Sequence, residues 1–208
     1  MKKKRKLKKK VVVILILVPI IIASISGVFI YKSLNKKETT HKEVVDKIST
    51  YGYTLENDHP KAYKKLFEEL TKVLNSEEVD EKKYAELIAQ MFAIDFYNLE
   101  NKVSKNDIGG VEFIANAYKD NFVLKASDTV YKYVEQNLYG DRKQTLPEVE
   151  SSSVKEVKND KYKYKNISDN NVYIVTVNLE YKKDLDYPEE VTIKLLHSDK
   201  KLEVYEMK

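Results

Sequence analysis

Cysteine is absent from the 208 residues of the chain. This absence excludes disulfide bonds, a thiol nucleophile, cysteine-ligated zinc and a lipid-modified N-terminal cysteine. It agrees with a location outside a bacterial cell whose secreted proteins form no disulfides. It also argues against a eukaryotic secreted domain, in which disulfides are common.

Arginine and histidine are scarce. Lysine outnumbers arginine by 35 to 2, whereas domains that grip phosphate groups more often use the planar fork of arginine. The three histidines, His41, His59 and His197, show no metal-ligand spacing, and the sequence contains no H-E-x-x-H motif. We therefore expect surface or helix-capping roles for the histidines, and neither a metal nor a cofactor.

The formal charge of +4 is distributed unevenly. Eight basic residues lie within residues 2–10, and the rest of the chain carries 29 basic against 33 acidic side chains, which leaves that part at −4. Only the N-terminal tail is basic, so the usual charge argument for a nucleic-acid-binding domain does not apply, and no nucleic acid is expected as a partner.

An uncharged apolar run follows the basic tail, from Val11 to Tyr31. As a helix this run would be about 31 Å long, which matches the hydrocarbon core of a bilayer. It shows no polar stripe, unlike the surface helix of a soluble core. Since positive flanks stay in the cytoplasm, we expect residues 32–208 outside the membrane. The tail is then expected to contact anionic lipid through Lys2, Lys3, Lys4, Arg5, Lys6, Lys8, Lys9 and Lys10.

A cleaved signal peptide is the main alternative to this anchor. Ser24 and Ser26 are small residues of the kind that precede a cleavage site, which would then follow Ser26. The apolar run continues beyond that point to Tyr31, and this continuation favours a retained span. A nucleic-acid-binding arm is a third interpretation, but such an arm needs no hydrophobic segment behind it.

The composition divides the chain into four parts. They are a cytoplasmic tail, a transmembrane helix, a polar stalk and an extracytoplasmic domain, at residues 1–10, 11–31, 32–50 and 51–208. Within the domain, apolar residues at helical spacing predict helices, over residues 60–74, 77–102, 111–122 and 127–138. The second of these is the most hydrophobic segment after the span, and we expect it to be the core helix.

The character of the sequence changes after Pro147, where short runs with strand periodicity begin. The predicted strands cover residues 154–158, 162–166, 172–182, 190–196 and 202–207. Apolar residues alternate along the third, with Tyr173, Val175, Val177 and Leu179 on one face. Helices followed by an antiparallel meander are typical of an α+β fold, with one sheet packed over the helices.

This order of elements resembles the cone-shaped α+β fold of nuclear transport factor two and its relatives. The relatives include membrane-anchored bacterial domains, among them bridging subunits of type IV secretion and conjugation machines. The resemblance covers residues 60–208 as topology alone. No motif matches, so no functional residue is carried over, and what the resemblance implies is an anchored outer domain that assembles with envelope proteins.

Asp95 is the one candidate for a reactive side chain. Its neighbours on the predicted helix, Met91, Phe92 and Leu99, are apolar, and burial of a carboxylate costs several kcal/mol unless the group is paired or protonated. Asp95 could be a general base in an interior pocket. The favoured alternative is a structural hydrogen bond, either to a sheet tyrosine or to N–H groups of the loop at residues 108–110.

No convergent catalytic set appears in the sequence. We therefore expect a non-enzymatic, single-pass membrane protein whose outer domain binds a protein partner in the cell envelope; the sequence leaves the oligomeric state open. Two alternatives remain. One is a ligand-pocket or hydrolytic cone-shaped domain with Asp95 in the pocket, and the other is a secreted protein with a cleaved signal. A binding module should expose apolar surface on its outer face, whereas a pocket protein should concentrate apolar surface around Asp95.

Overall fold

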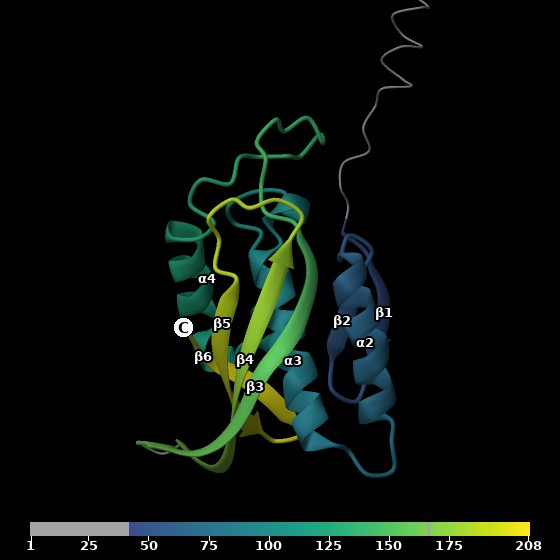
Figure 1. The fold of residues 1–208 in the computed structure, drawn as a ribbon, viewed down its shortest axis with the longest axis vertical. Helices are drawn as coiled ribbons and strands as arrows, with labels where there is room; N and C mark the ends of the chain where they lie inside the picture. The colour runs from purple at the N-terminus through teal and green to yellow at the C-terminus, as the bar shows by residue number, and fades with distance from the viewer. Residues whose placement is uncertain (1–41, 166) are drawn as a thin grey trace, which may run out of the picture. The chain divides into compact units, whose positions relative to one another are not determined.

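Two strands, three α-helices and four further strands follow one another along the residues that the computed structural model describes, 42–165 and 167–208 (Figure 1). The predicted tail and transmembrane helix, residues 1–31, lie outside this part of the chain, as does the first half of the predicted stalk. Within the described part, no helix has the length and hydropathy needed to cross a bilayer.

An antiparallel hairpin opens the described domain. Strand β1 (Val44–Ile48) pairs with β2 (Tyr53–Glu56), and Gly52 in the turn has a φ of +75°, a conformation that favours glycine. Strand β1 lies within residues 32–50, so the folded part begins ahead of Tyr51. Only Ile48 of β1 is buried. A strand exposed on both faces has no apolar alternation by which the sequence could reveal it.

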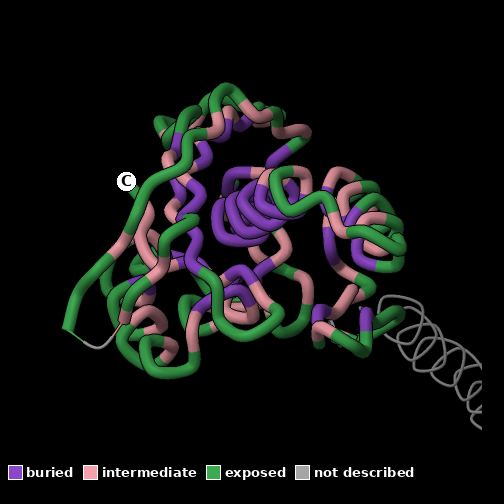
Figure 2. Tube along the Cα trace, turned by 90° about the horizontal axis from the view of Figure 1, so that it is seen from below, coloured by how far each residue is buried: buried purple, intermediate pink, exposed green. Residues whose placement is uncertain are grey.

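Helix α2 (Lys61–Leu74) starts directly after Pro60 and buries the apolar stripe that predicted it. Helix α3 (Glu81–Tyr97) begins after Asp80, whose side chain accepts a hydrogen bond of 2.9 Å from a backbone N–H group of the first turn. Every residue from Leu87 to Tyr97 is buried. Helix α3 is therefore the core helix, as predicted, and Figure 2 shows its buried turns at the centre of the domain.

The predicted extension of this helix to residue 102 is wrong. Asn98 leaves the helical conformation, with φ −82° and ψ 79°, and its side-chain Oδ1 accepts a hydrogen bond of 2.9 Å from the N–H group of Val149. Val149 is the first residue of the sheet. The helix thus ends where its C-terminal cap is tied to a strand some 50 residues away, a contact that local periodicity does not register.

Short helical turns and one further helix connect α3 with the sheet. They are η1 (Leu99–Asn101), η2 (Val111–Phe113), η3 (Asn116–Tyr118) and α4 (Lys119–Asp128). The continuous helix predicted over 111–122 is therefore broken into separate turns ahead of α4, because Ile114 and Ala115 adopt extended backbone conformations.

The helix predicted over 127–138 is also wrong, because α4 ends at Asp128. The Tyr131 hydroxyl donates a hydrogen bond of 2.6 Å to the carbonyl oxygen of Phe96 and accepts one of 3.0 Å from the N–H group of Gly109. Tyr131 is fully buried. These long-range contacts of one tyrosine outweigh the weak helical preference of the segment.

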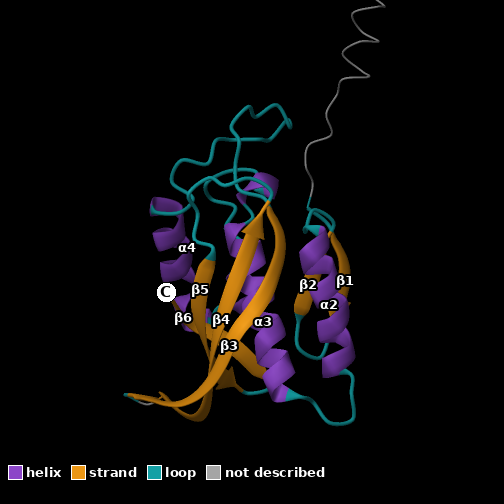
Figure 3. Cartoon of the chain, viewed as in Figure 1, coloured by secondary structure: helices purple, strands orange, loops and turns teal. Residues whose placement is uncertain are grey.

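The sheet is an antiparallel meander of four strands (Figure 3). In order they are β3 (Val149–Tyr164), β4 (Ile167–Tyr181), β5 (Glu190–Ser198) and β6 (Lys201–Met207). The strands predicted over 154–158 and 162–166 are parts of one longer strand, β3, which ends at Tyr164 and whose register with β4 shifts at three places.

The buried face of the sheet is the predicted one. Tyr173, Val175, Val177 and Leu179 of β4 are at most 5% exposed, and Asp199, with a φ of +52°, turns the chain between β5 and β6. Helix α3 packs between the inner face of the sheet and α2 (Figure 1). The described residues therefore form an α+β domain with one hydrophobic core, and Asp95 lies near the C-terminal end of its central helix.

Candidate functional site: a buried ionic cluster around Asp95

The Asp95 carboxylate is held by two direct partners in the interior of the domain. Its Oδ1 lies 2.6 Å from the Nζ atom of Lys102, and its Oδ2 accepts a hydrogen bond of 2.6 Å from the N–H group of Gly110. Asp95 is 8% exposed and Lys102 only 1%. The bond to Gly110 is one of the two structural partners predicted for Asp95, whereas the ammonium group of Lys102 was not anticipated.

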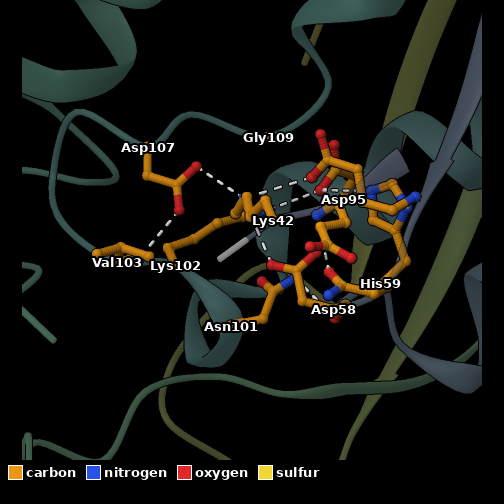
Figure 4. Close-up of polar contacts among 12 residues, drawn as sticks. Lys42, Asp58, His59, Asp95, Asn101, Lys102, Val103, Asp107 and Gly109 are labelled. Atoms are coloured by element: carbon orange, nitrogen blue, oxygen red, sulfur yellow. Dashed lines mark hydrogen bonds and ion pairs between the residues drawn. The ribbon is translucent and has the colours of Figure 1, made fainter. Parts of the chain in front are cut away.

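The backbone after α3 explains how Lys102 reaches Asp95. The chain reverses through η1, so a residue seven positions later returns to the end of the helix (Figure 4). The loop at Gly109 and Gly110 closes the other side. A Cβ atom on Gly109 would lie 2.0 Å from the carbonyl oxygen of Asp95, and one on Gly110 would lie 2.7 Å from the ring of Phe92. Both glycines are therefore required by close approach.

His59 is the third member of the Asp95 cluster, which we define as Asp95, Lys102 and His59. Its Nδ1 accepts a hydrogen bond of 2.9 Å from the N–H group of Glu56, so the proton of the neutral ring resides on Nε2, 3.7 Å from Oδ1 of Asp95. The ring stacks on Tyr63 with centroids 3.9 Å apart. His59 is 7% exposed, so the predicted surface or capping role is wrong.

The other two histidines do not join this cluster. His197 is exposed, and its Nδ1 lies 3.0 Å from Oδ2 of Asp169, which also accepts a hydrogen bond from the N–H group of His197. The surface role predicted for His197 is therefore confirmed. His41 lies outside the described residues.

Burial and charge set the protonation states of the cluster. Burial opposes ionisation of Asp95, but Lys102, His59 and the Gly110 N–H group together outweigh it and hold the pKa of Asp95 at about 2. Burial lowers the pKa of His59 to about 4, against the attraction of the Asp95 carboxylate. Near neutral pH the carboxylate is thus ionised and the imidazole is neutral.

A second set of charges surrounds Lys42, the residue at which the described part of the chain begins. Its ammonium group lies 2.8 Å from Asp107, 3.6 Å from Asp58 and 3.7 Å from Glu56 (Figure 4). The other oxygen of Asp107 accepts a hydrogen bond of 2.8 Å from the N–H group of Val103. The ammonium group of Lys42 thus occupies the position between the three carboxylates that another cation would otherwise take.

A polar pocket of about 170 Å³ is lined both by the Asp95 cluster and by Lys42 with two of its carboxylate partners, Glu56 and Asp107. Glu112 lines it and accepts hydrogen bonds from Thr54 and from the hydroxyl group of Tyr63, at 2.8–3.1 Å. Burial raises the pKa of Glu112, and these bonds oppose the shift. Among residues 42–165 and 167–208, no group of three or more His, Asp or Glu side chains is arranged to hold a metal ion.

No family model, curated protein or solved structure matches this chain. A general base needs a free lone pair and a pKa near the working pH. The Asp95 oxygens already face a cation and a backbone donor, and both ring nitrogens of His59 face partners, so the geometry favours a structural role for the cluster.

Arg142 is a further important residue that the sequence did not reveal. Its guanidinium group donates hydrogen bonds to the carbonyl oxygens of Lys102, at 2.7 Å, and Glu100, at 2.6 Å. The side chain is 2% exposed. In a chain with 35 lysines and two arginines, the use of arginine itself was the available signal, because its rigid planar group holds several donors in a fixed geometry.

Proposed function

We propose that this chain is a membrane-anchored protein whose outer α+β domain binds a protein partner in the cell envelope and performs no catalysis. The observation that carries the proposal is a stretch of exposed apolar side chains, which we call the apolar stretch and define as residues 118–139. Of the eight large apolar side chains exposed among the described residues, five lie there. The five are Tyr118, Leu124, Tyr133, Leu138 and Tyr139.

The apolar stretch combines exposure with a firm base. Tyr133 is 75% exposed and Tyr139 66%, whereas Tyr131 and Val134, on either side of Tyr133, have buried side chains. Tyrosine is enriched at protein interfaces because it offers a large contact area at low conformational cost. Large exposed apolar patches mark interaction surfaces, and these five side chains, close together in the sequence, are the candidates for such a patch.

The alternative with Asp95 in a catalytic pocket has lost its main support. That alternative needs apolar surface around a carboxylate that is free to react. Asp95 does line a pocket, but that pocket is mostly polar, and the carboxylate has a pKa of about 2 and faces an ammonium group and a backbone N–H group. A binding module is therefore favoured over a hydrolase.

The anchor and the location are proposed on the basis of sequence. Eight basic residues precede an uncharged run of 21 residues, and the positive-inside rule then assigns the described domain to the outer side. The resemblance to the nuclear transport factor two superfamily stays a prediction of topology. It adds the idea of assembly with envelope proteins but identifies no partner.

Site-specific photocrosslinking in living cells tests the partner. A photoreactive residue at Tyr133 or Tyr139 should capture the same envelope protein, while one at Lys161, which is exposed on β3, should not. Equal capture from all three positions, or none from the apolar stretch, would contradict the proposal. Alanine at whichever of the two tyrosines does not carry the photoreactive residue should weaken the capture and provides the loss-of-contact control.

The location has its own test. Because the chain has no cysteine, the variant Ser153→Cys offers a single thiol at an exposed position of β3. This thiol should react with an impermeant maleimide on intact cells. Reaction only after the cells are permeabilised would place the domain on the inner side and overturn the topology.

A further inference from the structure

An apolar groove of about 390 Å³ lies between helix α4 and strand β6. Figure 3 shows α4 on the side of the sheet where β6 lies. Phe92 and Phe96 of α3 and Phe122 of α4 form its floor, and Val204 and Met207 line the strand side. A groove of this size falls within the range of small-molecule sites, about 300–1,000 Å³.

The aromatic floor is a fixed surface. The ring centroids of Phe122 lie 5.5 Å from those of Phe96 and 6.0 Å from those of Phe92, and the rings of Phe92 and Phe96 are stacked at 5.8 Å. Each ring therefore holds the next in place. A ligand that covers this floor would gain apolar contact without first ordering the side chains.

Two charged side chains line the groove, Glu206 and Lys125, and only Glu206 is paired with opposite charges. Glu206 lines the strand side, but its carboxylate is already paired with Lys194 at 3.0 Å and Lys208 at 2.8 Å. Lys125 lines the helix side, and its ammonium group has no ion pair or hydrogen bond with any residue that the structure describes. The groove thus presents one uncompensated positive charge.

Asn121 stands one helical turn before Lys125 and also lines the groove. Residues four apart lie on the same face of a helix. The side-chain amide of Asn121 likewise has no hydrogen-bond partner among the described residues. Two unpartnered donors, an amide and an ammonium group, therefore meet at the edge of an apolar floor.

We propose that this groove binds a small amphiphilic carboxylate, with its apolar body on the phenylalanine floor and its carboxylate against Lys125 and Asn121. A single ammonium group matches the single charge of a carboxylate. A site for phosphate would instead favour several cations or an arginine fork. This ligand site goes beyond the proposed protein-binding function and does not depend on it.

The test uses the full chain reconstituted in vesicles of neutral phosphatidylcholine. A medium-chain fatty acid with a terminal diazirine is the probe, and the fatty alcohol of the same length is the matched neutral probe. After photolysis, mass spectrometry of proteolytic fragments should locate the label at residues 118–130 and 204–207. The alcohol should label these residues several-fold less than the acid.

Two variants and one control separate the contribution of the Lys125 charge to binding from that of the apolar floor. Lys125→Ala should weaken labelling by the acid about fivefold, as expected for loss of a part-exposed ion pair, and should leave labelling by the alcohol unchanged. Val130→Phe enlarges a half-buried side chain that lines the groove and should reduce labelling by both probes. Lys132→Ala, at an exposed lysine that does not line the groove, should change neither.

Specific outcomes would overturn the proposal. Label spread over the surface, or labelling by the acid that Lys125→Ala leaves unchanged, means that the groove is no carboxylate site. If Val130→Phe perturbs the fold, as judged by circular dichroism, the comparison of acid with alcohol in the Lys125→Ala variant still decides. The groove shares Tyr118 with the apolar stretch, but Tyr133 and Tyr139 do not line it, so loss of labelling would leave their crosslinks unaffected and the two proposals fail independently.

Discussion

The Asp95–Lys102 pair allows a direct test of whether the Asp95 cluster stabilises the fold. Replacement of Lys102 by methionine removes the ammonium group and keeps a long apolar side chain in the same space. Asp95 then remains buried with its Gly110 hydrogen bond and without its closest cation. An ion pair with both members less than a tenth exposed is costly to break from one side, because the remaining charge is desolvated and unpaired.

We expect Lys102→Met to reduce the free energy of unfolding by about 3–5 kcal/mol at neutral pH. For a domain whose total stability is of the order of 5–15 kcal/mol, this is a large fraction. The double variant Asp95→Asn, Lys102→Met should recover much of the loss, because an asparagine oxygen still accepts the Gly110 hydrogen bond and no buried charge is left.

The dependence on pH distinguishes this cause from a simple packing defect. Burial is the strongest influence on the pKa of Asp95 and it opposes ionisation, so in Lys102→Met we expect the pKa of Asp95 to rise. The folded variant then binds a proton more readily than the unfolded chain does. Its deficit relative to the natural chain should therefore shrink as the pH falls through the acidic range.

Urea unfolding of residues 40–208, followed by circular dichroism between pH 4 and 8, measures these differences. Lys61→Met, at an exposed lysine of α2, is the matched control and should change stability by less than about 0.5 kcal/mol. A loss below about 1 kcal/mol for Lys102→Met, constant across this pH range, would refute the idea that Asp95 is charged and depends on Lys102.

Three further results are expected. Gly109→Ala should destabilise the domain by at least about 3 kcal/mol in urea unfolding, because its Cβ atom would lie 2.0 Å from a carbonyl oxygen. In Gly52→Ala the nearest contact of the Cβ atom would be at 3.8 Å, so this variant should cost only the backbone strain of a positive φ, about 1–2 kcal/mol. Equal losses would contradict this geometry. Arg142→Lys should lose at least one of the three hydrogen bonds that Arg142 donates to carbonyl oxygens and cost about 1–2 kcal/mol, with faster proteolysis of residues 129–148; unchanged proteolysis would show that Arg142 does not hold this segment in place. His59 has its pKa lowered to about 4, so the unfolded chain takes up a proton first, and stability should fall by about 3 kcal/mol as the pH drops from 6.5 to 4. His59→Gln should flatten that part of the pH profile, and a profile that keeps its slope in this variant would assign the effect to another group.

The sequence predicts those parts of the fold in which local pattern and burial agree. The strand of β4 alternates regularly because one face lies on the core, and Val175 and Val177 are fully buried as expected. Helix α2 likewise carries one apolar stripe and is bounded by a proline. In both cases the residues that set the local pattern also make the tertiary contacts, so a short window of sequence contains the relevant information.

The sequence fails where a distant contact decides the local conformation. The apolar residues around Tyr131 are spaced as in a helix. Its hydroxyl group, however, forms hydrogen bonds with the backbone of Phe96 and Gly109, and the chain turns there instead of forming a helix. Lys102 is one of 35 lysines, and nothing nearby distinguishes it as the buried partner of Asp95. That pairing depends on the end of α3 at Tyr97, which is itself fixed by a strand far along the chain.

The ring of carboxylates around Lys42 has a mechanical consequence. A pull on the backbone ahead of Lys42 would act first on the ion pairs of this lysine and on β1, which contributes only Ile48 to the core. Because β1 is attached to the domain mainly by its backbone hydrogen bonds with β2, a sustained pull would detach β1 before it strained α3 or the four-stranded sheet. This edge of the domain would yield first, and the proposed partner and ligand sites would keep their shape.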